Sequence, residues 1–337
     1  MSARATLALG VLALALAAGA PALGCGGADE SLGLIGGEKV DPALIDRDPI
    51  ALLPSGIILV GYIDAYTMFQ SKWGGEVATA VTNVLPLGAS SNFQAQRDVT
   101  RIYAGLYAMQ GADFCAVVQG NFDVDAIKRS ADARAITISG APLVKSSYAG
   151  NDLYTAGNIG FVVLTPHTVI TGNETAMRRV LDRLRMGKLE RKVPPWMVDL
   201  LLTKNVSMAF AGDLNAQPTV DAASQTLPFL GNLRTVRILG NFQAPGMNFA
   251  GTLSYADEAS ASKASANLAH VQQIAGLVSL FSSIGFGAPL PSPQVMQQGS
   301  DLGITVAVDE GFVRLLLRQV GDATKQATTV TPTGTGR

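Results

Sequence analysis

Few side chains in this sequence could carry out acid–base, nucleophilic or metal chemistry. There are two histidines, His167 and His270, and two cysteines, Cys25 and Cys115. His167 lies in a Thr-Pro-His-Thr turn, and His270 lies in a helical pattern with no second metal ligand at helical spacing. Cys115 lies in a strand-like apolar run, where a thiol is usually buried and inert. The sequence therefore predicts no metal, no cofactor and no catalytic residue.

Two aspartates have similar positions in two parts of the chain. Asp64 and Asp213 each end a strand-like segment, and they lie 149 residues apart. Two such carboxylates could share a proton, as in a two-carboxylate hydrolase, or each could cap the helix that follows its strand. We favour caps, because the neighbouring residues lack the signature of aspartic proteases. A hydrolase with an unrecognised site is the weakest of the functional hypotheses.

The composition excludes two classes of protein. The chain has 337 residues, 25 Lys and Arg against 26 Asp and Glu, and 48% hydrophobic residues. This content is too apolar for a disordered chain. The balanced charge disfavours a nucleic-acid partner, which needs a basic face on the protein. We expect a folded protein that does not bind nucleic acid.

The amino terminus has the pattern of a secretory signal. One positive charge precedes an apolar run over 7–18, and small residues follow it. The run is shorter than the roughly 20 residues that span a bilayer. Ala22-Leu23-Gly24-Cys25 resembles the lipobox of bacterial lipoproteins, with Ala and Leu interchanged. The resemblance implies cleavage between Gly24 and Cys25 and acylation of Cys25; the alternative is ordinary cleavage after Ala22.

The two ends of the chain are expected to lie outside its folded body. We expect a signal peptide over 1–24, a flexible Gly-rich tether over 25–50 and a disordered tail over 324–337. By the same resemblance, Gly26 after the cysteine, in place of an Asp, implies the outer membrane. The expected location is therefore the cell envelope, lipid-anchored and facing the periplasm.

The body carries signs of an internal repeat. Gly-Ala-Pro-Leu at 140–143 recurs at 287–290, and Gly-Phe-Val at 160–162 recurs at 311–313, in the same order along the chain. Each half has a strand, a helix, two strands joined by a turn, a second helix and a hairpin. The sequence predicts an α+β fold with two pseudo-repeated halves, 51–192 and 204–323. Each half would be a mainly antiparallel sheet with helices packed on one face.

The expected elements can be placed by their periodicity. Helices are predicted over 66–85, 124–133, 174–185, 220–230 and 258–283. The second half is expected to end in a hairpin with strands over 304–308 and 312–318, turning at Asp309-Glu310-Gly311.

The helix after Gly172 is strongly basic. Between Arg178 and Lys192 there are seven basic and two acidic residues. Such a segment could meet anionic lipid headgroups, although charge runs are more often a solvated helix face. The candidate anionic-surface patch consists of five residues: Arg178, Arg179, Arg183, Arg185 and Lys188.

A second segment, 274–287, is strongly apolar and rich in small residues. Leu277, Leu280, Phe281 and Phe286 could line a pocket for a hydrophobic ligand. The helical spacing of the apolar residues favours a buried core helix instead. A periplasmic carrier of a hydrophobic ligand is therefore an alternative rather than the preferred function.

Two segments resemble a known group of proteins. The strand–Gly–helix sequence from Thr168 to Leu181, and Leu53-Pro54-Ser55-Gly56 before a strand, are similar to uncharacterised lipoproteins of the myxobacterial type. The resemblance extends over most of the mature chain. It implies a lipid-anchored envelope protein with a duplicated α+β body, and it carries no established activity. We expect a non-catalytic protein that binds or scaffolds an unknown envelope partner.

Overall fold

The computed structural model describes most of the folded body of the chain. The described residues are 40–78, 91–108, 113–133, 142–156, 159–215, 217, 224–225, 227–269, 293–311 and 313–314. Cys25, the signal peptide, the predicted tail over 324–337 and the apolar segment 274–287 lie outside them.

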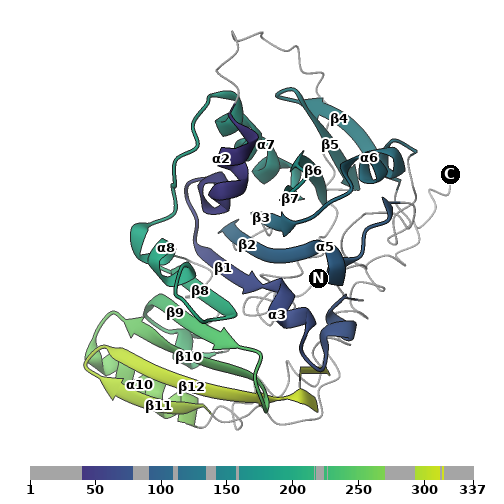
Figure 1. Cartoon of the computed structure of the whole chain (residues 1–337). Helices are drawn as coiled ribbons and strands as arrows, with labels where there is room; N and C mark the ends of the chain where they lie inside the picture. The colour runs from purple at the N-terminus through teal and green to yellow at the C-terminus, as the bar shows by residue number, and fades with distance from the viewer. Residues whose placement is uncertain are drawn as a thin grey trace, which may run out of the picture.

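In the described part of the chain, twelve strands form one antiparallel sheet (Figure 1). Their order is β11-β12-β10-β9-β8-β1-β2-β3-β7-β6-β5-β4. The strands are β1 (Leu59–Asp64), β2 (Val99–Ala108), β3 (Asp113–Gly120), β4 (Val144–Tyr148), β5 (Asn151–Ala156), β6 (Ile159–Thr165), β7 (Thr168–Asn173), β8 (Met208–Asp213), β9 (Leu233–Asn241), β10 (Gly246–Tyr255), β11 (Gln294–Gln298) and β12 (Asp301–Asp309). The predicted α+β class and antiparallel pairing are confirmed.

The prediction of a separate sheet in each half is wrong, because β1 and β8 pair directly at the centre. Their antiparallel register runs from Leu59 opposite Gly212 to Ile63 opposite Met208. From this pair the sheet extends through β2 and β3 on one side and through β9 and β10 on the other. Farther out the two sides differ, since β3 pairs with β7 whereas β10 pairs with β12.

Helices connect and cover these strands. They are α2 (Pro42–Arg47), η2 (Pro49–Leu52), α3 (Ala65–Phe69), α5 (Ala95–Asp98), α6 (Val124–Asp132), α7 (Glu174–Arg185), α8 (Pro195–Leu201), η4 (Pro228–Leu230) and α10 (Glu258–Ala269). The predicted helices at 124–133 and 174–185 are confirmed as α6 and α7. The prediction for 258–283 is confirmed as far as residue 269, and the rest lies outside the described residues. The helix predicted over 66–85 is interrupted at 70–73.

The last part of the predicted tether is folded. Helix α2 is capped by the Asp41 carboxylate, which accepts a hydrogen bond from the Ala43 amide at 2.9 Å. Ile45 and Ile50 are buried in the core. The tether prediction over 25–50 is therefore wrong for residues 42–50, because their apolar side chains gain more by packing on the sheet than by staying in water.

A polar contact fixes α2 to the sheet. The Asp46 carboxylate accepts hydrogen bonds from the hydroxyls of Thr165, at 2.5 Å, and Thr168, at 2.7 Å. These threonines end β6 and begin β7. The side-chain amide of Gln119 on β3 donates to the backbone carbonyl of Asp46 at 2.7 Å. The amino-terminal helix is thus bound to strands that lie far away in the sequence.

The inner strands of the sheet are covered on both faces. On one face, α2, η2, α7 and α8 bury a cluster that includes Val60, Val117 and Ala209. On the other face, α3, α6 and residues 73–77 bury a second cluster, which includes Phe161 and Trp73. The predicted arrangement of helices on one face only is therefore wrong for these strands.

The outer strands β9, β10, β12 and β11 are covered on one face only. Helix α10 packs on that face against Leu253 and Leu302. The opposite face continues the face that carries Ala209, since Ala209 of β8 lies opposite Leu239 of β9. On this opposite face, the Arg237 guanidinium lies 4.9 Å from the centre of the Trp196 ring of α8. No other described residue packs on this face of the four strands. We call this surface the open face; it consists of Arg237, Ala250, Thr252, Gln294, Met296, Gly303, Thr305 and Ala307.

The predicted strand over 312–318 is wrong where the structure describes it. Residues 310–311 and 313–314 are helical. Strand β12 ends at Asp309, opposite the first residue of β10, so no neighbouring strand remains to pair with a continuation. Val313 is buried instead, and Arg314 pairs with Glu310 at 2.9 Å and with Glu76. The end of the second half therefore packs against the first half.

Candidate functional site

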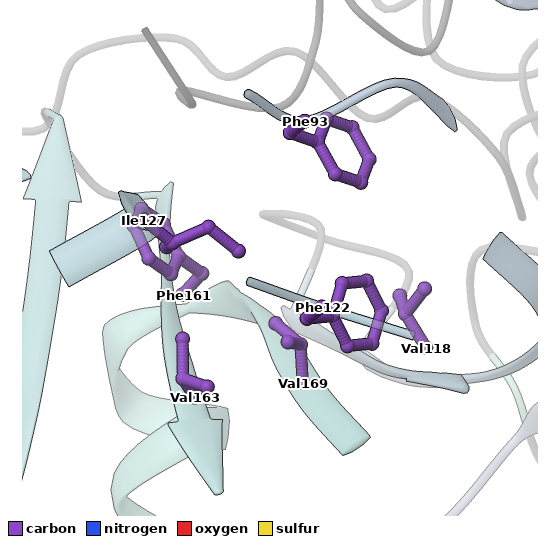
Figure 2. Close-up of a pocket in the computed structure, with 7 residues that line it drawn as sticks. All are labelled: Phe93, Val118, Phe122, Ile127, Phe161, Val163 and Val169. Carbon is purple, nitrogen blue, oxygen red and sulfur yellow. The ribbon is translucent and has the colours of Figure 1, made fainter. Parts of the chain in front are cut away.

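A small cavity lies on the sheet face that α6 covers (Figure 2). It is lined by seven apolar side chains from three strands, α6 and two loops: Phe93, Val118, Phe122, Ile127, Phe161, Val163 and Val169. The rings of Phe93 and Phe122 stack at 6.4 Å between centroids. The cavity volume is about 10 Å³, which is about the space of one water molecule.

The lining of this cavity decides what it can accept. It offers dispersion contacts and no hydrogen bond, so it suits an apolar group. Ligand sites in proteins usually enclose roughly 300–1,000 Å³, so a lipid chain would need the cavity to widen. Four candidate ligand residues lie outside the described residues: Leu277, Leu280, Phe281 and Phe286.

The four arginines of the predicted basic patch lie on α7, and the first of them, Arg178, already has partners. Arg178 pairs with Glu174 one turn earlier, at 2.6 Å. Its guanidinium also lies over the Tyr148 ring, 4.6 Å from the centroid. Near the end of the helix, Arg185 pairs with Asp182 at 3.0 Å. Part of the positive charge that the sequence shows is thus balanced within the helix.

Arg179 belongs to a half-buried cluster beneath α7. It pairs with Asp113 of β3 at 2.6 Å, and its guanidinium lies 4.6 Å from the centre of the Tyr107 ring. Burial raises the pKa of the Tyr107 hydroxyl well above its usual value. The Tyr107 hydroxyl, one Asp113 carboxylate oxygen and the Arg179 Nε are buried without a hydrogen-bond partner. The guanidinium compensates part of this cost through its contact with the ring.

Arg183 joins α7 to two other segments. It donates a hydrogen bond to the Leu53 carbonyl at 2.6 Å, and another to the Glu190 carbonyl. Burial lowers the pKa of the Arg183 guanidinium from its usual value. Lys188, the last residue of the predicted patch, is exposed. The structure therefore brings the four arginines to one helix, but each of them contacts other groups of the protein. Binding of anionic headgroups by this patch stays a prediction.

The two aspartates that could have formed a dyad lie far apart. β1 and β8 are antiparallel, so Asp64 and Asp213 lie at opposite ends of the pair. At 3.4 Å per residue, the separation is roughly 20 Å. Asp64 caps α3 by accepting from the Thr67 amide at 2.9 Å, as predicted, and Asp213 accepts from the Asn215 amide at 3.1 Å. These carboxylates cannot share a proton.

His167 has the structural role that its turn predicts. Its Nδ1 lies 3.0 Å from the Gly120 carbonyl, and its amide donates to the Thr165 hydroxyl at 3.0 Å. His270 lies outside the described residues. Within the described ranges, no group of three or more His, Cys, Asp or Glu side chains could hold a metal ion.

Cys115 should be inert in the folded protein. It is fully buried on β3, and burial raises the pKa of its thiol to about 12. At pH 8 roughly one thiol in 10,000 would be ionised, and the thiolate is the nucleophile. We expect no labelling of Cys115 by iodoacetamide at pH 8 within hours, and complete labelling in 6 M guanidinium. Rapid labelling of the native protein, located at Cys115 by peptide mass, would contradict this environment.

Two sets of polar residues had no signal in the sequence. Asp46 meets Thr165 across 119 positions, and Arg179 meets Asp113 across 66. A sheet has to be assembled before these residues become neighbours, so spacing along the chain gives no indication of either contact.

Comparisons with known proteins give a limited result. No family model and no curated protein matches the sequence. Crystal forms I, III and IV of the protein TP0453 match at 11% identity, with TM-scores of 0.48, 0.49 and 0.46. The matches cover 83, 80 and 82% of this chain and 98, 97 and 96% of TP0453. At TM-scores below 0.5 the likeness supports no inference about what this chain binds.

Among the described residues, no helix is long and apolar enough to cross a bilayer.

Proposed function

We propose that this chain is a lipid-anchored protein of the cell envelope, held at the outer membrane by acylated Cys25 and facing the periplasm. It binds or scaffolds a partner and catalyses no reaction. The observation that carries the binding role is the open face, a broad sheet surface that the described residues leave uncovered.

The composition of the open face supports contact with another macromolecule. One row across the four strands consists of Arg237, Thr252, Gly303 and Met296, which lie opposite one another in register. The small residues Ala250 and Gly303 let a partner approach the main chain closely, and Met296 offers exposed apolar surface that a partner could bury. An antiparallel sheet tolerates water on one face, so the fold does not require this surface to be covered.

The engagement of the reactive side chains supports a non-catalytic role. Asp64 caps a helix and His167 holds a turn. Cys115 is buried with a raised thiol pKa. Each of these groups already has a structural function or an environment that suppresses its reactivity.

The location of α2 fits a short connection to the membrane. Residues 26–41 separate Cys25 from the start of α2 at Pro42. Fully extended, that length of chain spans at most about 55 Å. Two or more acyl chains give stable membrane attachment, at about 0.8 kcal/mol per buried CH₂. The folded body would then lie within one protein diameter or so of the bilayer.

We expect Cys25→Ser to move the protein from the membrane fraction to the soluble fraction almost completely. The serine hydroxyl cannot take the thioether-linked lipid, and in the parent protein intact mass should show a mature chain that begins at acylated Cys25. Cys115→Ala is the matched control, since it removes the other thiol and should leave the protein in the membrane fraction. A Cys25→Ser protein that still sediments with membranes, or a parent chain that begins at Leu23 without lipid, would refute the anchor.

The alternative function, a carrier of a hydrophobic ligand, predicts that the protein binds a single lipid molecule. Its support is the wholly apolar lining of the cavity at Phe122 and Val169. Because that cavity holds about one water molecule, we expect no saturable binding of a fluorescent fatty acid to the Cys25→Ser protein at micromolar concentrations. Saturable one-to-one binding that Val169→Phe abolishes, and Ala250→Phe on the open face leaves intact, would establish the carrier instead.

A further inference from the structure

Strand β11 forms one edge of the twelve-stranded sheet, and no described residue pairs with its outer side. We propose that two copies of this chain associate by antiparallel pairing of β11 with β11, which would join their sheets edge to edge. The occupant of this edge is therefore a second copy of the same chain. The proposal adds a partner to the binding role above, and its test does not depend on the lipid anchor.

The sequence of β11 lacks the features that usually protect a sheet edge. Residues 294–298, Gln-Val-Met-Gln-Gln, contain no charge and no proline, and the pairing with β12 has no bulge. Natural edge strands commonly use charges, prolines or bulges to prevent further pairing. The opposite edge, β4, has such a charge: Lys145, in ion pairs with Asp132 at 2.8 Å and Asp152 at 3.1 Å.

The hydrogen-bonding groups of β11 suit a symmetric partner. β11 and β12 are joined by the two-residue turn Gly299-Ser300, and Gln298 lies opposite Asp301. In such a hairpin the closing pair is hydrogen-bonded, and bonded pairs alternate with unbonded ones. The amides and carbonyls of Val295 and Gln297 therefore point outward. Their antiparallel pairing with the same residues of a second copy would place Met296 on the two-fold axis.

The side chains in this register are self-complementary. Met296 would face Met296 of the second copy at an unbonded position, and its side chain is 76% exposed in the single chain. Gln294 would face Gln298 of the second copy, so amide would meet amide. No pair of like charges is opposed, which is the arrangement that destabilises cross-strand pairs.

The edge is held firmly enough to serve as a template. The side-chain amide of Gln297 donates to the Ser262 hydroxyl of α10 at 2.9 Å and to the Gly299 carbonyl at 3.0 Å. Pairing along five residues buries much less than the roughly 1,200–2,000 Å² of stable complexes, so the dimer in solution should be weak. Anchoring on one membrane would concentrate the chains and favour pairing.

Disulfide trapping tests both the contact and its register. In the Cys25→Ser protein, whose remaining Cys115 is buried, we introduce Met296→Cys or, as the matched control, Gln294→Cys. Unbonded antiparallel positions have Cα atoms about 4.5 Å apart, within disulfide range, whereas two copies of position 294 would be roughly 14 Å apart. With mild copper–phenanthroline oxidation we expect at least tenfold more disulfide dimer from Met296→Cys than from Gln294→Cys. Equal yields, or no dimer from Met296→Cys, would overturn the proposal.

Sedimentation of Cys25→Ser variants without added cysteines measures the dimer dissociation constant, independently of the disulfide trapping. Met296→Lys places two like charges on the two-fold axis and should weaken dimerisation at least tenfold. Ala250→Lys adds the same charge to the open face two strands away, and it should change the dimer constant less than twofold. A Cys25→Ser protein without further substitutions that stays monomeric up to millimolar concentration, or equal effects of the two lysines, would refute pairing through β11. Loss of the lipid anchor is detected by membrane partition instead, so failure of the two proposals can be told apart.

Discussion

Gly172→Ala should lower the free energy of unfolding by about 3 kcal/mol or more, because it combines an unfavourable backbone conformation with a main-chain overlap. Gly172 lies on β7 with φ of +149°, and a Cβ at this position would overlap the carbonyl oxygen of Phe114 on β3. Both the backbone conformation and the contact exclude a side chain. The overlap is with main-chain atoms of a paired strand, so it cannot be relieved by rotating a side chain.

Urea unfolding followed by circular dichroism measures the effect, and Gly150→Ala is the control. Gly150 has φ of +75° in the turn between β4 and β5, and no atom lies within 4 Å of its added Cβ. Gly150→Ala therefore costs only the free energy of placing alanine in a left-handed backbone conformation, about 1 kcal/mol. If the two variants were equally stable, the close packing of β7 against β3 would be wrong.

Arg183→Met should cost about 2–4 kcal/mol, because it leaves two carbonyls without their charged donor. Methionine retains much of the aliphatic packing of the arginine stem, so the loss reports mainly on the hydrogen bonds to the Leu53 and Glu190 carbonyls. Leu53 is fully buried, and water cannot easily replace the lost donor there.

Arg185→Met, two residues along the same helix, is the comparison. Arg185 is exposed and pairs with Asp182, which also accepts from the Tyr148 hydroxyl at 3.0 Å. Surface ion pairs contribute about 0–1 kcal/mol, so this variant should lose less than about 0.5 kcal/mol. Chemical denaturation measures the free energy of unfolding of both variants. If Arg185→Met were the more destabilised, the stabilising role of the Arg183 hydrogen bonds would be wrong.

The elements that the sequence predicts correctly are those with a local signal. Alternating apolar residues and the Asp64 cap of α3 both depend on residues close together in the chain. The spacing of Leu181 and Leu184, with Met177 and Val180 beside them, predicts helix α7; Met177, Val180 and Leu181 are buried, and Leu184 is half-buried.

What the sequence could not show depends on distant pairing. Nothing local indicates that β1 pairs with β8, and this pair is what joins the two expected sheets into one. The predicted strand over 312–318 is wrong at residues 313 and 314, because Val313 is apolar in a helix or a strand alike, and only the end of β10 excludes the strand.

The candidate sites show the same limit. The apolar cavity draws Phe93, Ile127 and Val163 from separate segments, so no motif identifies it. The basic patch was found as a run of charges, but its partners Asp113 and Leu53 come from elsewhere in the fold. Composition therefore overestimated the free positive charge on α7.

The attachment of α2 also determines how the protein responds to force. A pull through the amino terminus reaches the folded body at α2, before any strand of the sheet. The contacts that resist it come one after another along the chain: Asp46 to Thr168, Asp48 to Arg191 at 2.8 Å, and Leu53 to Arg183. Each can break without disturbing the hydrogen bonds of β1. In a chain anchored at its amino terminus as proposed above, tension would detach α2 before it reaches any strand, and this short helix would thereby protect the twelve-stranded sheet.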